Sequence, residues 1–191
     1  IQGDPNRKLS TRPQMEKDEW QKFCEKISEL VKYLEDEGMP LAYHHHMGTV
    51  IETQKDTERL IENTHESVKL TLDTGHMLFA KGDSKSILQN YHERILHVHC
   101  KDIRKQVLEK SLKEDLSFRG AFLEGAFTVP GDGCIDYQPL FNVLKNNNYS
   151  GWLVVEAEQD PAKANPLEYA KIGYNYLTDT LKKSEIEIYK N

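Results

Sequence analysis

Cysteine is scarce in this sequence, and the few cysteines present exclude one class of protein. Cys24, Cys100 and Cys134 lie far apart along 191 residues, and no two of them form a Cys-x-x-Cys pair. Small secreted proteins are held together by an even number of paired cysteines. The pattern therefore favours reduced thiols and a cytoplasmic protein over a disulfide framework.

Long hydrophobic runs and a basic field are absent as well. No apolar stretch approaches the ~20 residues of a membrane-spanning helix, and no basic-then-apolar leader opens the chain. Lysine and arginine alternate with acidic residues, and the formal net charge is -6. We therefore expect no membrane and no nucleic acid as partner. The 38% of hydrophobic residues can fill a core, which predicts a single soluble domain over residues 1–191.

Three functional motifs with recognisable sequences are also missing. No serine lies in a nucleophile elbow or beside a base, so a nucleophilic hydrolase has little support. No dinucleotide fingerprint is present, and the glycines of 128–133 lack the pattern of a phosphate loop. Acidic residues and histidines remain as the groups that could carry chemistry.

The predicted elements follow the order strand then helix, four times over. Aliphatic and β-branched runs predict strands, and apolar residues three and four apart predict amphipathic helices. Strands are expected at 41–44, 68–72, 95–99 and 151–156, helices at 15–37, 55–63, 84–91, 104–115, 137–146 and 166–181, N-caps at Asp83 and Asp136, and a long functional loop at 116–134. This order predicts an α/β fold of parallel strands, with functional groups beyond the strands' carboxyl ends.

An aspartate ends the second predicted strand. Asp73 follows largely apolar residues, where desolvating an unpaired carboxylate is unfavourable. For an isolated Asp-Thr-Gly, capping of a strand-to-helix turn is the simpler explanation. His76 lies three residues further on, and other strands end in comparable groups, which favours a metal ligand.

The third and fourth strands end in further residues that can bind metal. His97 and His99 share one face of a strand; we expect His97 to be a core histidine hydrogen-bonded to backbone. Glu156 and Glu158 also share a face, and a carboxylate there requires a cation or a proton. A salt bridge to Lys101 is the competing explanation. Imidazole beside carboxylates suits Mn, Co, Fe or Zn better than Mg or Ca.

Three consecutive histidines follow the first strand. By alternation His44 and His46 face the same way, and the roles of metal ligand and substrate donor both stay open for them. His45 is expected to support the site from outside it. Cys100 points away from His99 on the third strand and is expected to pack in the core.

Taken together, these segments resemble the C-terminal part of the inosose dehydratases, in the xylose-isomerase-like TIM-barrel superfamily. The resemblance covers nearly the whole chain, and its segments are much more specific together than singly. They are Tyr43-His44-His45-His46-Met47-Gly48-Thr49, Leu72-Asp73-Thr74-Gly75-His76, His97-Val98-His99-Cys100-Lys101-Asp102-Ile103-Arg104, Val129-Pro130-Gly131-Asp132-Gly133-Cys134-Ile135-Asp136 and Glu156-Ala157-Glu158-Gln159-Asp160-Pro161.

The resemblance implies a TIM (β/α)8 barrel of which this chain forms the C-terminal four βα units. The chain begins at Ile1 without an initiator methionine, and residues 1–5 resemble a loop that leaves a strand. The first three strands and most of the fourth would then precede Ile1, so the chain is expected to be truncated at its N-terminus. Four strands cannot close such a barrel, which predicts exposed apolar sheet edges.

The resemblance also implies a set of metal ligands. The superfamily uses Glu, Asp, His and Glu from its last four strands, and the last three correspond to Asp73, His99 and Glu156. At the first position this sequence departs from the pattern. It offers His44, with His46 two residues on, so the fourth ligand stays open between them. A substrate-binding histidine three residues after the metal aspartate corresponds to His76.

The implied reaction is dehydration of 2-keto-myo-inositol to a cyclic diketone in inositol catabolism, with Mn²⁺ or Co²⁺. A base removes a carbon-bound proton, and the β-hydroxyl leaves with help from a general acid. His46, His76, Lys101 and Glu158 are expected to transfer protons and contact substrate hydroxyls, and the sequence does not divide acid from base among them. Glutathione is associated with the family, but no residues mark a site for it.

Two alternatives stay open from the sequence. A sugar isomerase or epimerase would share the metal and return the proton to carbon, and the His-His-His-Met-Gly-Thr run favours the dehydratase over it. A non-catalytic sugar-binding barrel is the second alternative, and the intact Asp73, His99 and Glu156 argue against it. The metal's identity and the oligomeric state, including a homo-oligomer, stay open as well.

Overall fold

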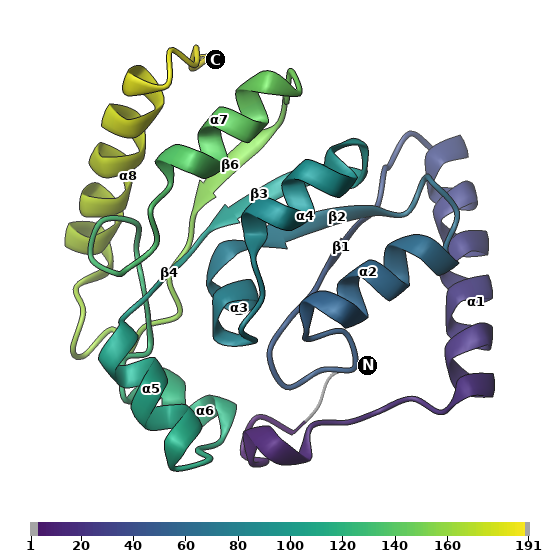
Figure 1. Ribbon diagram of the computed structural model, residues 1–191, viewed down its shortest axis with the longest axis horizontal. Coiled ribbons are helices and arrows are strands. Elements are labelled where there is room, and N and C mark those ends of the chain that lie inside the picture. The colour runs from purple at the N-terminus through teal and green to yellow at the C-terminus, as the bar shows by residue number, and fades with distance from the viewer. Residues whose placement is uncertain (1–3, 190–191) are drawn as a thin grey trace.

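The computed structural model describes residues 4–189, and its centre is a sheet of four parallel strands. The strands lie in the order β1-β2-β3-β6, with helices around the sheet (Figure 1). Their bounds are Ala42–His44 for β1, Lys69–Asp73 for β2, Ile95–Cys100 for β3 and Trp152–Val155 for β6. All four predicted strands are confirmed to within one residue at each end. Residues 1–3, part of the segment predicted to leave a strand, lie outside the described residues.

The middle strand β2 shows why this sequence forms a buried parallel sheet. Leu70, Thr71, Leu72 and Asp73 are all buried, which is the pattern of a strand covered on both faces. The outer strand β6 differs, because Trp152 is 65% exposed. The strands β1 and β6 each have one described neighbour, so they form the two edges of the sheet.

Six helices occupy the positions expected from the sequence, and they surround the sheet (Figure 1). In α1 the side chains of Trp20, Cys24, Ile27 and Val31 are buried at a spacing of three and four residues. Gly38 follows that helix with φ of 72°, a conformation that glycine adopts without strain. The bounds are Lys17–Asp36 for α1, Gln54–Asn63 for α2, Ser84–Tyr91 for α4, Lys105–Lys113 for α5, Gln138–Asn146 for α7 and Pro166–Lys183 for α8.

The prediction of one long loop over 116–134 is wrong. This stretch contains the helix α6 (Phe118–Leu123) and the strand β5 (Phe127–Thr128), which pairs antiparallel with β4 (Asp102–Ile103). A two-residue strand and a six-residue helix are too short to show a hydrophobic period. Ser117 caps α6 by accepting a hydrogen bond from the Gly120 amide.

Three smaller elements and one cap also differ from expectation. The helix α3 (Thr74–Phe79) and the 3-10 turns Leu9–Thr11 and His92–Arg94 were not predicted. Asp83 caps α4 as predicted. Asp136 is not the N-cap of α7, because the helix begins one residue later and Tyr137 takes that position. Asp136 still accepts a hydrogen bond from the Gln138 amide at 3.0 Å, so the carboxylate serves the same helix end from one position further out.

Two apolar clusters hold the ends of the central strands and the start of α7 in place. The larger joins the sheet to the helices and includes Leu72, Val98, Cys100 and Tyr137, which confirms that Cys100 packs in the core. The smaller lies beneath α5 and α6 and includes Phe127. Because each cluster contains side chains from distant segments, the ends of β2 and β3 are held rigidly beside the start of α7.

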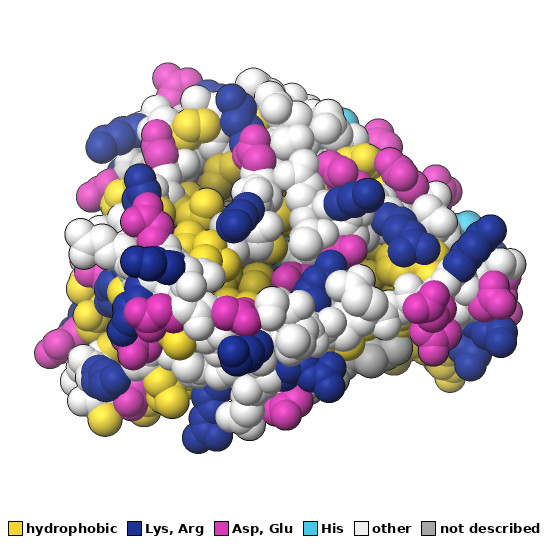
Figure 2. Space-filling model, turned by 60° about the horizontal axis from the view of Figure 1, so that its bottom comes forward, with side chains coloured by type: hydrophobic (Ala, Val, Ile, Leu, Met, Phe, Trp, Pro, Cys, Tyr) yellow, Lys and Arg dark blue, Asp and Glu magenta, His cyan; other side chains and the backbone are white. Residues whose placement is uncertain are grey.

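The surface carries both signs of charge. Figure 2 shows lysine and arginine interspersed with aspartate and glutamate on one face, with hydrophobic side chains in a hollow between them. No helix in the described part of the chain combines the length and apolar character needed to cross a membrane.

Leu72 provides a test of how β2 supports the fold. Its side chain is fully buried, so Leu72→Ala is expected to lower the free energy of unfolding by about 2–5 kcal/mol through lost burial and a cavity. Leu167→Ala is the matched control, because Leu167 is 64% exposed and its change should stay within about 0.5 kcal/mol. Urea unfolding followed by circular dichroism measures both, and equal losses would contradict the assignment of Leu72 to the core.

Candidate active site

All eight residues predicted for the site lie at the carboxyl-terminal edge of the sheet. Strands β1, β2 and β3 bring His44, Asp73 and His99 to this edge, and Glu156 directly follows β6. The remaining four are His46, His76, Lys101 and Glu158, each within three residues of a strand's end. Parallel strands end at the same edge, so residues up to 114 positions apart in sequence meet there.

Asp73 has no exposed surface and uses its two carboxylate oxygens differently. Oδ1 accepts a hydrogen bond from the His76 amide at 2.8 Å and so caps α3. Oδ2 faces His44 Nε2 at 3.2 Å and Lys101 Nζ at 3.2 Å. Burial by itself would raise the pKa of Asp73, but neighbouring His76, His44, His99 and Lys101 hold that pKa well below its ordinary value. The predicted capping role is therefore correct for Oδ1, while Oδ2 faces the side chains of the site.

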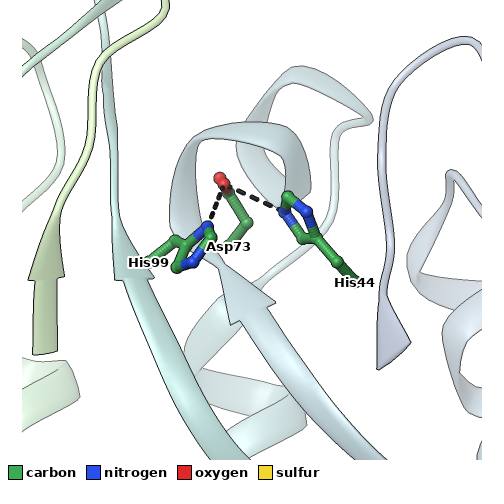
Figure 3. A group of neighbouring side chains, drawn as sticks. All are labelled: His44, Asp73 and His99. Carbon is green, nitrogen blue, oxygen red and sulfur yellow. Dashed lines mark hydrogen bonds and ion pairs between the residues drawn. The ribbon is translucent and has the colours of Figure 1, made fainter. Parts of the chain in front are cut away.

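His44, Asp73 and His99 form the first cluster of groups that can bind metal (Figure 3). One nitrogen or oxygen from each lies within 4.8 Å of the others. His99 Nδ1 is 3.6 Å from Asp73 Oδ2 and 2.6 Å from Glu156 Oε2. Glu156 therefore reaches the cluster through His99.

The contact between His99 and Glu156 tests whether a cation fits this cluster. His99 Nδ1 and Glu156 Oε2 are buried and have no hydrogen-bond partner, although they lie only 2.6 Å apart. Buried polar atoms without partners are rare in native proteins. The lone pairs of these two atoms point toward the same space without the alignment of a hydrogen bond, and a bound cation between them would satisfy both. Two imidazoles together with two carboxylates form a ligand set that suits a transition metal.

Without a cation, a proton takes the same place. The carboxylates of Asp73 and Glu156, 3.6 and 2.6 Å from His99 Nδ1, raise the pKa of His99 to about 9, against the opposing effect of burial. The carboxylates that would bind a metal therefore hold a proton on His99 at neutral pH when metal is absent. Metal and proton compete for this nitrogen.

Lys101 connects this cluster to the rest of the site. Its ammonium lies 3.0 Å from Glu158 Oε2, 3.2 Å from Asp73 Oδ2 and 3.4 Å from Glu156 Oε1. Burial would lower the pKa of Lys101, but the negative charges of Asp73, Glu158 and Glu156 raise it above its ordinary value. The salt bridge considered as a competing explanation for the two glutamates is present. It supplies a fixed positive charge in the middle of the site.

His46, His76 and Glu158 form the second cluster whose ligand-capable atoms lie within 4.8 Å. The amide of Met47 donates to His76 Nδ1 at 3.4 Å, which favours the neutral tautomer with its proton on Nε2. Lys101 Nζ lies 3.1 Å from this Nε2, and in that tautomer the ammonium donates to its three carboxylate neighbours and not to the ring. That Nε2 is 3.3 Å from Glu158 Oε2 and can donate to it. Burial lowers the pKa of His76 to about 4, so the ring is neutral at pH 7. A metal on Nε2 would have to displace this proton, which makes the cluster better suited to hydrogen bonding.

Glu158 and His46 are the partly exposed members of this cluster. Their side chains are 27% and 26% exposed, and His46 Nε2 lies 3.6 Å from Glu158 Oε1. The other ring nitrogen, His46 Nδ1, donates to the Met47 carbonyl at 2.7 Å. Burial opposes protonation of His46, but hydrogen bonding to Glu158 and Met47 raises its pKa above 6.5. Burial would raise the pKa of Glu158, but His46, His76 and Lys101 hold it well below its ordinary value.

His45 supports the site from behind, as the sequence predicted. Its Nε2 accepts a hydrogen bond from the Asp73 amide at 3.1 Å, and both residues have no exposed surface. Burial lowers the pKa of His45 to about 3, so the ring stays neutral. The prediction of a core histidine at His97 is wrong, because its side chain is only half-buried and, within residues 4–189, it shows no hydrogen bond to the backbone. Its ring lies 5.2 Å from that of His99.

Two phenylalanines that the sequence does not predict as site residues contact the site. The ring of Phe118 is 5.1 Å from that of His46, and the ring of Phe127 is 5.1 Å from that of His76. Lys101 Nζ lies 5.4 Å from the centroid of Phe127. Both belong to the segment predicted as a loop, and the only signal was the tendency of long loops to carry function.

Comparison with known proteins places these residues in a family. The family described as xylose isomerase-like TIM barrel matches residues 5–180. An inosose dehydratase of Clostridium beijerinckii is 49% identical over 163 residues, covering 85% of this chain and 55% of that protein. The rhizopine catabolism protein MocC of Rhizobium meliloti is 46% identical, covering 88% of this chain and 52% of that protein. The predicted resemblance to inosose dehydratases is confirmed, and the chain spans about half the length of these relatives.

A solved structure shares the fold. The IOLI protein, crystallised with a bound zinc atom, superposes with a TM-score of 0.68 at 21% identity, covering 91% of this chain and 60% of that chain. This likeness supports the α/β TIM-barrel class predicted from the sequence.

Lys101→Met tests the charge balance of the site in the metal-free protein. Three carboxylates would remain together without the ammonium, and breaking a buried ion pair costs about 3–5 kcal/mol of unfolding free energy. Lys110→Met is the control, because its exposed pair with Glu124 should leave stability nearly unchanged.

The loss in Lys101→Met should also depend on pH. The depressed pKa values of Asp73 and Glu158 stabilise the wild type above the ordinary carboxyl pKa of about 4, and that contribution disappears as pH falls. Urea unfolding at pH 7 and at a pH well below 4 should therefore show a smaller difference between Lys101→Met and wild type at the lower pH. A difference that is constant with pH would count against the proposed charge balance.

Proposed function

We propose that this chain, which belongs to the xylose isomerase-like TIM-barrel family, acts as a metal-dependent hydro-lyase that removes water from 2-keto-myo-inositol. The observation that carries this proposal is the pair of unpartnered atoms His99 Nδ1 and Glu156 Oε2 beside Asp73, in a chain 49% identical to an inosose dehydratase. The small-molecule partner is then a cyclic keto-polyol, and the reaction belongs to inositol catabolism.

The proposed metal ligands are His44, Asp73, His99 and Glu156. His44 is favoured over His46 as the fourth ligand because His44 Nε2 lies 3.2 Å from Asp73 Oδ2, whereas His46 faces Glu158. Mn²⁺ and Co²⁺ are the proposed ions. A bound divalent ion supplies Lewis-acid stabilisation of the charge that develops on the substrate ketone.

The fold proposal is that β1, β2, β3 and β6 are the last four strands of an eight-stranded barrel. Strands β1 and β6 each have one described strand neighbour, and the exposed Trp152 lies on the outer strand. An edge of this kind is normally covered or paired. Residues 1–191 would then form part of one barrel domain.

The second cluster is proposed to handle the protons and hydroxyls. Lys101 and the Nε2–H of His76 are donors, suited to substrate hydroxyl oxygens. Glu158 is the proposed base for the proton on the carbon next to the ketone, and its basicity would rise when substrate takes over hydrogen bonds that it now receives from His46 and His76.

The proposed dehydration proceeds by two proton transfers and the loss of one water molecule. The carbon–hydrogen bond breaks, and Glu158 receives the proton. The bond from carbon to the β-hydroxyl oxygen then breaks, and protonated His46 donates Nε2–H to that oxygen, which leaves as water. The enol that remains tautomerises to the second ketone. His46 ends neutral, with its remaining proton on Nδ1 and still donated to the Met47 carbonyl.

The test of the reaction is dione formation from 2-keto-myo-inositol with Mn²⁺ or Co²⁺, with and without glutathione. We expect turnover that disappears when a chelator is in excess and returns when Mn²⁺ or Co²⁺ is restored. Metal binding without dione would refute the dehydratase and favour an isomerase or epimerase. Neither metal binding nor turnover would favour a sugar-binding barrel.

The ligand set is tested by metal affinity. Asp73→Asn should weaken Mn²⁺ binding by more than the roughly 10–100-fold that loss of an outer-sphere partner costs, because it removes a charged ligand. Asp179→Asn changes an exposed carboxylate of α8 and should leave the affinity unchanged. Calorimetry on metal-free protein gives both values, and an unchanged affinity in Asp73→Asn would rule out this site.

His46 predicts a specific pH dependence. A general acid must be protonated, and hydrogen bonding raises the pKa of His46 above 6.5 despite burial, so kcat should fall as pH rises through that pKa. His46→Asn should lower kcat about 10²–10⁴-fold and remove this alkaline limb. A limb that persists in His46→Asn at reduced kcat would assign it to another group.

A further inference from the structure

Lys101 is held in place by residues that no role in metal binding or proton transfer explains. It lies between β3 and β4, where the main chain leaves the sheet, and is fully buried. A lysine side chain has many rotamers, and three carboxylates at 3.0 to 3.4 Å surround its ammonium. The position of the ammonium therefore depends on where its main chain is fixed and which path its side chain follows.

Thr74 fixes the main chain of Lys101 from both sides. Its Oγ1 accepts a hydrogen bond from the Lys101 amide at 3.2 Å and donates to the Lys101 carbonyl at 2.7 Å. Both residues are buried. A buried peptide that leaves a sheet needs partners for its donor and its acceptor, and one hydroxyl supplies both here.

Tyr137 adds a second contact from a distant segment. Its hydroxyl lies 3.0 Å from the Lys101 carbonyl and 2.9 Å from Thr74 Oγ1. Burial raises the pKa of Tyr137 well above its ordinary value, so the hydroxyl keeps its proton and remains a donor. Tyr137 stands at the start of α7 and packs against Phe141, which ties the Lys101 carbonyl to the helix layer.

Gly75 leaves room for the lysine side chain. A Cβ at this position would lie 2.7 Å from Lys101 Cγ and 3.0 Å from Lys101 Cβ and Cδ. The aliphatic part of Lys101 therefore passes directly over the glycine. Any larger residue at position 75 would push the lysine side chain aside, since the side chain is the flexible partner.

We propose that Thr74, Gly75 and Tyr137 form a lysine collar, a set of positioning residues that places the Lys101 ammonium between the metal cluster and Glu158. The inference rests on the proposed function for its effect on catalysis and on the contacts above for its geometry. In the segment Asp73-Thr74-Gly75-His76, the outer two residues contact the site directly, and the inner two act through Lys101.

Tyr137→Phe is the main test, with Tyr149→Phe as its matched control. The Tyr149 hydroxyl also donates to main-chain carbonyls, those of Leu96 and Trp152, but it makes no contact with the site. We expect Tyr137→Phe to lower kcat for 2-keto-myo-inositol about 10-fold with little change in KM, because small displacements of a positioned group lower rates steeply. Tyr149→Phe should change kcat less than about 2-fold. We expect it to lower the melting temperature by about as much as Tyr137→Phe does.

Gly75→Ala tests the path of the side chain. It should lower kcat more than Tyr137→Phe does, by about 100-fold, while Mn²⁺ affinity measured by calorimetry stays near that of the wild type. Gly38→Ala, where a Cβ would meet nothing within 4 Å, serves as a control for glycine replacement at a backbone position with φ of 72°. A melting temperature lowered in both variants with kcat lowered only in Gly75→Ala supports the collar.

A readout independent of turnover separates the collar from the proposed reaction. The ¹⁵N signal of the Lys101 ammonium, assigned by its loss in Lys101→Met, should shift or broaden in Tyr137→Phe and Gly75→Ala and stay in place in Tyr149→Phe. If the wild type forms no dione, the proposed function fails and this comparison still decides the collar. If Tyr137→Phe and Tyr149→Phe match in both kcat and the ammonium signal, Tyr137 serves stability alone and the inference is overturned.

Discussion

The whole site depends on the burial of one carboxylate. Asp73 has no exposed surface, and an ionised carboxylate in that position requires both hydrogen bonds and positive charge nearby. The structure supplies them from different elements. In the first turn of α3, the His76 amide donates to Asp73 Oδ1, and the ring of His45 accepts a hydrogen bond from the Asp73 amide. Lys101 and two histidines surround Asp73 Oδ2.

Lys101 makes the two clusters of the site into one electrostatic unit. Its ammonium contacts carboxylates of both clusters, Asp73 and Glu156 on one side and Glu158 on the other. A positive charge fixed in a buried position stabilises developing negative charge more than the same charge in water does, because the local dielectric is low.

The sequence predicted the four strands and the six longer helices well and the segment 116–134 poorly. Aliphatic runs such as that before Asp73 mark buried strands clearly, because a strand covered on both faces must be apolar along its length. The segment with Phe118 and Phe127 gave no such signal. Its short helix and strand are stabilised by packing against α5 and by pairing with Asp102–Ile103, and such contacts are not visible in a local window of sequence.

The amino-acid sequence by itself determined which residue types stand at the strand ends, because side-chain alternation and the common edge of parallel strands follow from local pattern. Tertiary structure decided how these residues divide the work. Only the folded chain shows that one oxygen of Asp73 caps α3 while the other faces His44, and that Tyr137 reaches the carbonyl of Lys101. The physical reason is that hydrogen-bond direction, burial and pKa depend on atoms from segments far apart in the chain, and a sequence orders those segments without placing them in space.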